Sequence, residues 1–148
     1  MSLKQQLTDA MKGAMKAKDS ERLNAIRLIL SAVKNREIEA RAELDDQGVI
    51  AVLTTLVKQR KESAQVYRDN QRLDLAEKEE AELKVLQEFL PEPLSEDELM
   101  ALIDEVITEL GASSMRDMGK VMKLVGERAQ GRADGKAAST LVKARLAG

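Results

Sequence analysis

Apolar residues recur every three or four positions along most of this chain, a spacing that places them on one face of an α-helix. Up to residue 90 the pattern predicts four helices, at about residues 2–18, 19–43, 46–69 and 73–90. Ser2 and Gln5 have the spacing of a capping box, and Asp19 or Ser20 can cap the second helix. Because the connections are short, consecutive helices are expected to be antiparallel neighbours in a bundle or hairpin region.

The two prolines of the chain, Pro91 and Pro93, stand together and predict a domain boundary. Each lacks a backbone donor and disfavours helix at the residue before it. We therefore expect an N-terminal helical domain at residues 1–90, a linker at 91–94 and a second domain at 95–148.

The pattern beyond the linker predicts three more helices, enough for a small bundle. Leu94 and Leu99 are spaced as a hydrophobic staple around the start of the first. The expected N-terminal caps are Ser95 with Glu98, Ser114 with Asp117, and Asp134. The whole chain is thus predicted to be all-α.

The amino-acid composition limits the kinds of functional site that the chain can form. Tyr67 and Phe89 are the only aromatic residues, and the chain has neither cysteine nor histidine, so disulfides, thiolate nucleophiles and the usual zinc ligands are excluded. No cofactor or metal is expected. No apolar run is long enough to cross a bilayer, and the N-terminus contains several lysines instead of the apolar stretch of a signal peptide, so we predict a soluble cytoplasmic protein with no membrane partner.

Charge is unevenly distributed. Residues 1–90 contain 16 acidic and 16 basic residues, residues 91–111 contain seven acids and no base, and residues 112–148 contain three acids and eight bases. The last segment therefore has a net charge of +5. A basic surface of this kind suits phosphate.

The basic segment predicts a nucleic-acid contact surface. Its candidate phosphate contacts are Lys120, Lys123, Arg128, Arg132 and Lys136. Gly119, Gly131 and Gly135 are candidates for close approach of another backbone, either a packed helix or a polynucleotide. Since this segment has no aromatic side chain on which bases could stack, any RNA would be recognised through its backbone shape, as folded or duplex RNA is.

Catalytic signals are weak. The cluster of Glu77, Glu79, Glu80 and Glu82 spreads around a helix axis, which favours structural roles, and no glycine loop has phosphate-binding spacing. A non-catalytic protein is the preferred interpretation.

Two groups of motifs resemble a known family. Met118-Gly119-Lys120-Val121-Met122-Lys123 and Gly131-Arg132-Ala133-Asp134-Gly135 resemble the tail domain of the B subunit of tRNA-dependent amidotransferases. Upstream, Glu21-Arg22-Leu23, Lys58-Gln59-Arg60-Lys61-Glu62-Ser63, Asp74-Leu75-Ala76 and Phe89-Leu90-Pro91 are similar to stand-alone bacterial members of the GatB/YqeY family. The resemblance implies a tail that touches tRNA, but the chain has no room for the ATP-using domain of the amidotransferase.

Three functional hypotheses follow. The first is an accessory protein that binds tRNA or is associated with tRNA-dependent amidation or translation. The second is a helical adaptor for a protein partner, such as a synthetase or an amidotransferase complex. The third, a carbon–nitrogen ligase with glutamine as amido-N donor, is implied only by the resemblance.

Arg60 interrupts the apolar stripe of the third predicted helix. A lone buried guanidinium is costly, so a carboxylate partner is expected. Glu79 lies at the matching level of the fourth helix if the two helices form a hairpin, and it predicts a partly buried ion pair with Arg60. The alternatives are that Arg60 extends past the rim to solvent or that it binds an anion.

Overall fold

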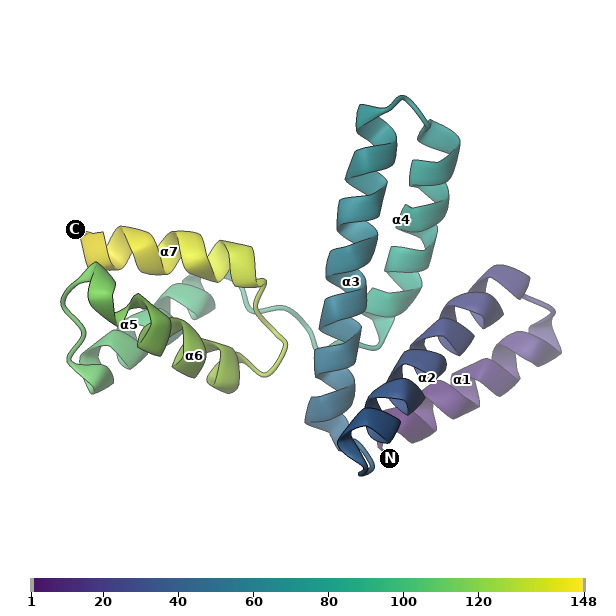
Figure 1. Cartoon of the computed structure of the whole chain (residues 1–148), viewed down its shortest axis with the longest axis horizontal. Helices are drawn as coiled ribbons and strands as arrows, with labels where there is room; N and C mark the ends of the chain where they lie inside the picture. Colours follow the sequence, from purple (N-terminus) through teal and green to yellow (C-terminus); the bar gives the residue numbers. More distant parts are fainter. Residues whose placement is uncertain (1, 148) are drawn as a thin grey trace. The chain divides into compact units, whose positions relative to one another are not determined.

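The computed structural model describes residues 2–147 and confirms the all-α prediction. Figure 1 shows its helices in chain order. They are α1 (Leu3–Ala17), α2 (Ser20–Ala40), α3 (Asp46–Asp69), α4 (Leu73–Glu88), α5 (Glu96–Leu110), the 3-10 helix η1 (Met115–Asp117), α6 (Met118–Ala129) and α7 (Gly135–Ala147). None of the helices within this described range is long and apolar enough to span a bilayer.

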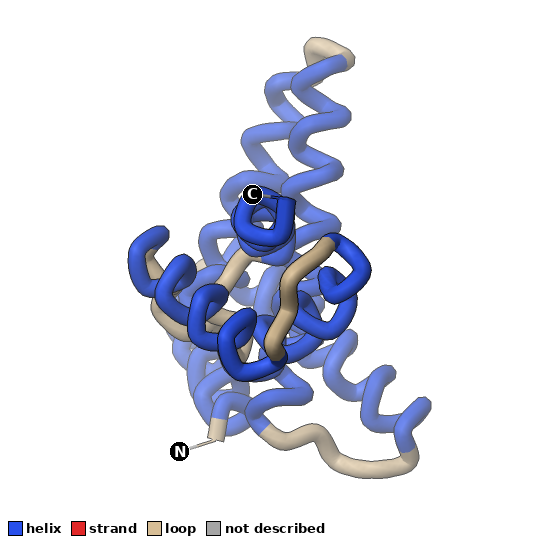
Figure 2. The backbone as a smooth tube through the Cα atoms, turned by 90° about the vertical axis from the view of Figure 1, so that its left-hand side faces the viewer, coloured by secondary structure: helices blue, strands red, loops and turns tan. Residues whose placement is uncertain are grey.

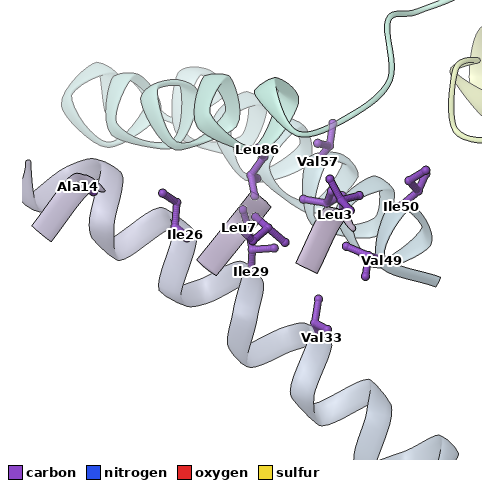
Figure 3. Packing of buried hydrophobic residues seen from close by; sticks show 11 residues of the cluster. Leu3, Leu7, Ala14, Ile26, Ile29, Val33, Val49, Ile50, Val57 and Leu86 are labelled. Carbon is purple, nitrogen blue, oxygen red and sulfur yellow. The ribbon is translucent and has the colours of Figure 1, made fainter. Parts of the chain in front are cut away.

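The chain divides into two units, one ending at Leu90 and one beginning at Pro91. We call them unit 1 and unit 2. Unit 1 consists of two antiparallel hairpins, α1 with α2 and α3 with α4, whose loops point in different directions (Figures 1 and 2). The core of unit 1 lies where all four helices meet (Figure 3). Its fully buried side chains include Leu7, Ile26, Ile29, Leu53 and Leu86.

The N-terminal end of α1 is held by the last turns of α2 and the first residue of α3. Glu37 accepts hydrogen bonds from Lys4 Nζ at 2.6 Å and from the Leu44 N–H at 2.8 Å. The Leu3 N–H donates to Asp46 Oδ1 at 2.9 Å. These contacts explain why α2 ends at Ala40 rather than near residue 43 as predicted: the chain must turn here to bring Leu44 back to Glu37, and Arg41 takes the left-handed conformation that ends the helix.

Two other predicted helix ends differ from the structure. The Ser2 hydroxyl accepts from the Gln5 N–H at 3.1 Å, but the Gln5 side chain bonds Asp9, so only half of the predicted capping box forms. Helix α4 ends at Glu88 instead of residue 90. The reason is Pro91, which disfavours helical geometry at Leu90.

Unit 2 is a bundle of α5, α6 and α7. Its buried side chains include Ile103, Val106, Val121, Val125 and Val142. Both bonds of the Ser95–Glu98 capping box form, at 3.1 and 3.2 Å. The Ser114–Asp117 box also forms, but it opens η1, and α6 begins only afterwards at Met118.

Candidate nucleic-acid interface

The predicted phosphate contacts lie on α6, on the loop after it and at the start of α7. Lys120, Lys123 and Lys136 are exposed, and the structure gives none of them an ion pair within residues 2–147. Their ammonium groups are therefore available to an external anion.

Helix α6 presents an outer face made of Gly119, Lys120, Lys123 and Gly126. Val121 and Val125 are buried in the bundle, and the 100° step per residue puts the four outer-face residues away from them. A Cβ atom added at Gly119 or Gly126 would meet nothing within 4 Å. No other helix of unit 2 therefore packs against these glycines, and within this unit their backbone is open to solvent.

The other two predicted glycines have different surroundings. Gly131 has φ +79° and completes the turn after α6, a conformation that suits a residue without Cβ. Gly135 is the first residue of α7, and a Cβ there would also meet nothing within 4 Å. The local backbone conformation thus explains why residue 131 is a glycine, whereas Gly135 is open to solvent beside Lys136.

Arg128 and Arg132 are already engaged within unit 2. Arg128 forms ion pairs with Glu109 and, at 3.6 Å, with Glu105. Arg132 Nε donates to the Glu92 carbonyl at 2.8 Å, and the Arg132 carbonyl accepts from the Leu94 N–H at 2.7 Å. Arg132 therefore ties the segment after Pro91 to the loop between α6 and α7.

The basic segment folds against the acidic one. Arg145 lies 3.1 Å from Asp104 of α5, and Arg128 pairs with the same helix. Residues 91–148 together have ten acids and eight bases, a net charge of −2. The strongly positive tail seen in the sequence is thus partly neutralised, and the exposed bases without an ion pair in the described part of unit 2 are Arg116 and the lysines. Near the start of α5, the N–H of Ser95 lowers the pKa of Glu98, with its hydroxyl the next largest cause.

In unit 1, Arg60 faces two carboxylates of α4. Its Nη1 lies 3.0 Å from Glu79 Oε2, and its Nε lies 3.2 Å from Glu82 Oε2, without the alignment of a hydrogen bond. The side chains of Arg60, Glu79 and Glu82 are 24%, 17% and 26% exposed. Glu82 was not predicted as a partner, although its i+3 spacing from Glu79 placed both on one helix face. With two internal carboxylates, Arg60 has no net charge to offer an external anion.

Two of the family-like motifs meet in unit 1. Arg22 Nη1 lies 2.6 Å from Glu88 Oε2, and its guanidinium lies 5.9 Å from the centre of the Phe89 ring. These contacts fix the end of α4 against α2. Within residues 2–147, no group of three or more acidic side chains is arranged to hold a metal ion.

The chain is similar to yeast proteins named "Altered inheritance of mitochondria protein 41, mitochondrial". It is 38% identical to the one from Lachancea thermotolerans over 107 residues, which cover 70% of this chain and 57% of the relative. The identity is 43% over 81 residues for Vanderwaltozyma polyspora, covering 54% of this chain and 44% of the relative. For Kluyveromyces lactis it is 39% over 111 residues, covering 72% and 60%. The chain thus spans less than two thirds of the length of these relatives.

These relatives contradict the predicted cytoplasmic location, because all three are named as mitochondrial proteins. The prediction was wrong because it rested on the lack of an apolar segment. Such a lack does not distinguish one compartment from another.

A family match over almost the whole chain tests the resemblance that the sequence motifs indicate. The Yqey-like protein family matches residues 4–146, which include all seven α-helices except Leu3 at the start of α1 and Ala147 at the end of α7. The match confirms the predicted family: the chain belongs to the Yqey-like proteins.

Proposed function

We propose that this protein is a non-catalytic accessory protein that binds folded RNA of the tRNA type through the α6 outer face and Lys136. The observation that supports this most strongly is the α6 outer face itself. It combines two open helical glycines with two exposed lysines that have no ion pair within the described chain.

The glycines point to a close contact with something outside the chain. A glycine inside a helix costs about 1 kcal/mol relative to alanine. An internal packing contact would explain that cost, but none exists at Gly119 or Gly126. A polynucleotide backbone that approaches the helix closely would use both the missing side chains and the neighbouring ammonium groups.

The chemistry of unit 2 favours folded RNA over single strands. Both aromatic residues of the chain belong to unit 1, so unit 2 has no ring on which an unstacked base could lie. Lysines that contact phosphates recognise the path of the RNA backbone and not the identity of the bases. The resemblance to the tail domain of tRNA-dependent amidotransferases makes tRNA the first RNA to test.

The test is a titration of tRNA binding against salt concentration, by fluorescence anisotropy, for the parent and for the double variant Lys120→Gln/Lys123→Gln. We expect measurable affinity at low salt, and a plot of log affinity against log salt whose slope is shallower by about 2 in the variant. Arg132 is left unchanged because its contacts with Glu92 and Leu94 are structural.

The matched control is Lys61→Gln/Lys84→Gln in unit 1. It removes two exposed lysines on helices α3 and α4, where acidic residues are close in sequence. A parent without affinity at low salt would refute RNA binding. Equal slopes for the α6 variant, the control and the parent would show that the α6 outer face is not the contact surface.

A further inference from the structure

Helix α2 has an outer stripe that is free of acidic residues. The stripe consists of Asn24, Arg27, Ser31, Lys34 and Asn35, all of them exposed. The buried side chains Ile29 and Val33 lie on the opposite side, as the 100° step requires. No acidic residue occurs between Arg22 and Arg36. Residues 1–90 as a whole are balanced in charge, because acidic residues outside this segment offset its bases.

The bases of this stripe differ from four other arginines of unit 1. Arg22, Arg60, Arg68 and Arg72 each lie within 4 Å of a carboxylate of α4. Arg27 and Lys34 form no ion pair within residues 2–147. They are two helical turns apart, roughly 10 Å along the axis, so each can neutralise its own anionic group.

The adjoining helix α1 also has exposed bases in a segment without acidic residues. Lys12 and Lys16 are exposed and lie opposite the buried Leu7 and Ala14. Between Ala10 and Lys18 there is no acidic residue. The first hairpin therefore carries several unpaired positive charges on its solvent side.

The side chains between the bases indicate which anion this surface fits. Ser31 and Asn35 are uncharged hydrogen-bonding groups of the kind that contact phosphate and sugar oxygens in nucleic-acid complexes. A membrane surface would require a continuous apolar face beside the bases. The apolar face of α2 is buried in the core, and its exposed large apolar residues, Leu28 and Ile38, are ten positions apart.

We propose that the α2 outer stripe is a second RNA-binding surface, located in unit 1, in which Arg27 and Lys34 contact phosphates. This inference rests on the proposed function in that the partner is the same RNA. Because the two units belong to one chain, contact at one surface raises the effective concentration of RNA at the other.

The experiment compares five proteins: the parent, Arg27→Gln/Lys34→Gln, the charge-conserving Arg27→Lys/Lys34→Arg, Lys120→Gln/Lys123→Gln, and the control Lys61→Gln/Lys84→Gln. Each is titrated with tRNA over a series of salt concentrations. Each is also mixed with vesicles of phosphatidylcholine and phosphatidylserine in equal amounts. Glutamine is a good helix former and the changed positions are exposed, so the fold is expected to persist, as circular dichroism can verify. The charge-conserving variant Arg27→Lys/Lys34→Arg should keep the affinity of the parent.

We expect the α2 variant to bind tRNA more weakly than the parent, with a salt slope shallower by about 2, while the control is unchanged. An α2 variant that behaves like the control, while the α6 variant is impaired, would overturn this inference and leave the proposed function standing. If the α6 variant instead behaves like the control while the α2 variant is impaired, the α2 surface is supported and the α6 outer face is refuted. Absence of parent binding to tRNA would refute both. If the α2 variant loses binding to vesicles but binds tRNA like the parent, the stripe is a lipid-binding surface and the inference is overturned.

Discussion

Replacing Arg60 by Met is expected to destabilise unit 1 more than replacing Glu79 by Gln. Among residues 2–147, Arg60 is the only cation paired with Glu79 and Glu82. Its removal leaves two carboxylates close together on one face of α4, both mostly shielded from water. Glu79→Gln, in contrast, leaves Arg60 paired with Glu82.

The magnitudes follow from burial. Breaking a fully buried ion pair by removing one partner costs about 3–5 kcal/mol. Here the three side chains are 24%, 17% and 26% exposed, so water relieves part of that cost. We expect a loss of about 2–3 kcal/mol for Arg60→Met. For Glu79→Gln, which loses one charged hydrogen bond but no neutralising partner, we expect about 1 kcal/mol.

Tyr67 gives a selective assay. It is the only tyrosine, the chain has no tryptophan, and Tyr67 lies on α3, so its fluorescence reports the unfolding of unit 1. Urea unfolding followed at this residue should rank the parent above Glu79→Gln and Glu79→Gln above Arg60→Met. The triple variant Arg60→Met/Glu79→Gln/Glu82→Gln should recover much of the loss, because no charge remains unpaired. Equal stability of the parent and Arg60→Met, or no recovery in the triple variant, would refute this reasoning.

Further predictions concern pH, capping and the α6 outer face. The hydrogen bond from Lys4, followed by that from the Leu44 N–H, lowers the pKa of Glu37 below its ordinary value of 4.5. The resulting stability is therefore present above that value and lost as pH falls through the lowered pKa, so Glu37→Gln should show a weaker acid dependence of unit 1 unfolding. Ser95→Ala should destabilise unit 2 by about 1 kcal/mol in urea unfolding followed by circular dichroism, because α5 loses its cap. Gly119→Ala should stabilise unit 2 by about 0.5–1 kcal/mol, since the added Cβ meets nothing, yet reduce tRNA affinity; a variant that binds as well as the parent would remove the close-contact argument. Glu127→Gln, which removes an exposed acid one turn after Lys123, should increase tRNA affinity at low salt, and an unchanged affinity would argue against phosphate contact there.

The helices and most of their caps could be predicted from sequence because they depend on local information. Apolar spacing, the Ser95–Glu98 capping box and the prolines after Leu90 act within a few residues. The helix ends that were predicted wrongly depend on contacts with residues distant in sequence or on competing hydrogen bonds. The end of α2 depends on Glu37 reaching Leu44 and Lys4, and the side chain of Gln5 bonds Asp9 instead of the helix start.

The charges show most clearly what the sequence determined by itself and what only the tertiary structure decided. The sequence determined that the chain is helical, that it has neither cysteine nor histidine, and that its last segment is basic. Only the packing of α5 against α6 and α7 decided that Arg128 and Arg145 are used within unit 2, and that Lys120 and Lys123 are not. In the same way, packing of α3 against α4 placed a second carboxylate on Arg60. The physical reason is distance: an ion pair requires approach to within about 4 Å, and residues far apart in sequence acquire that distance only when the helices pack.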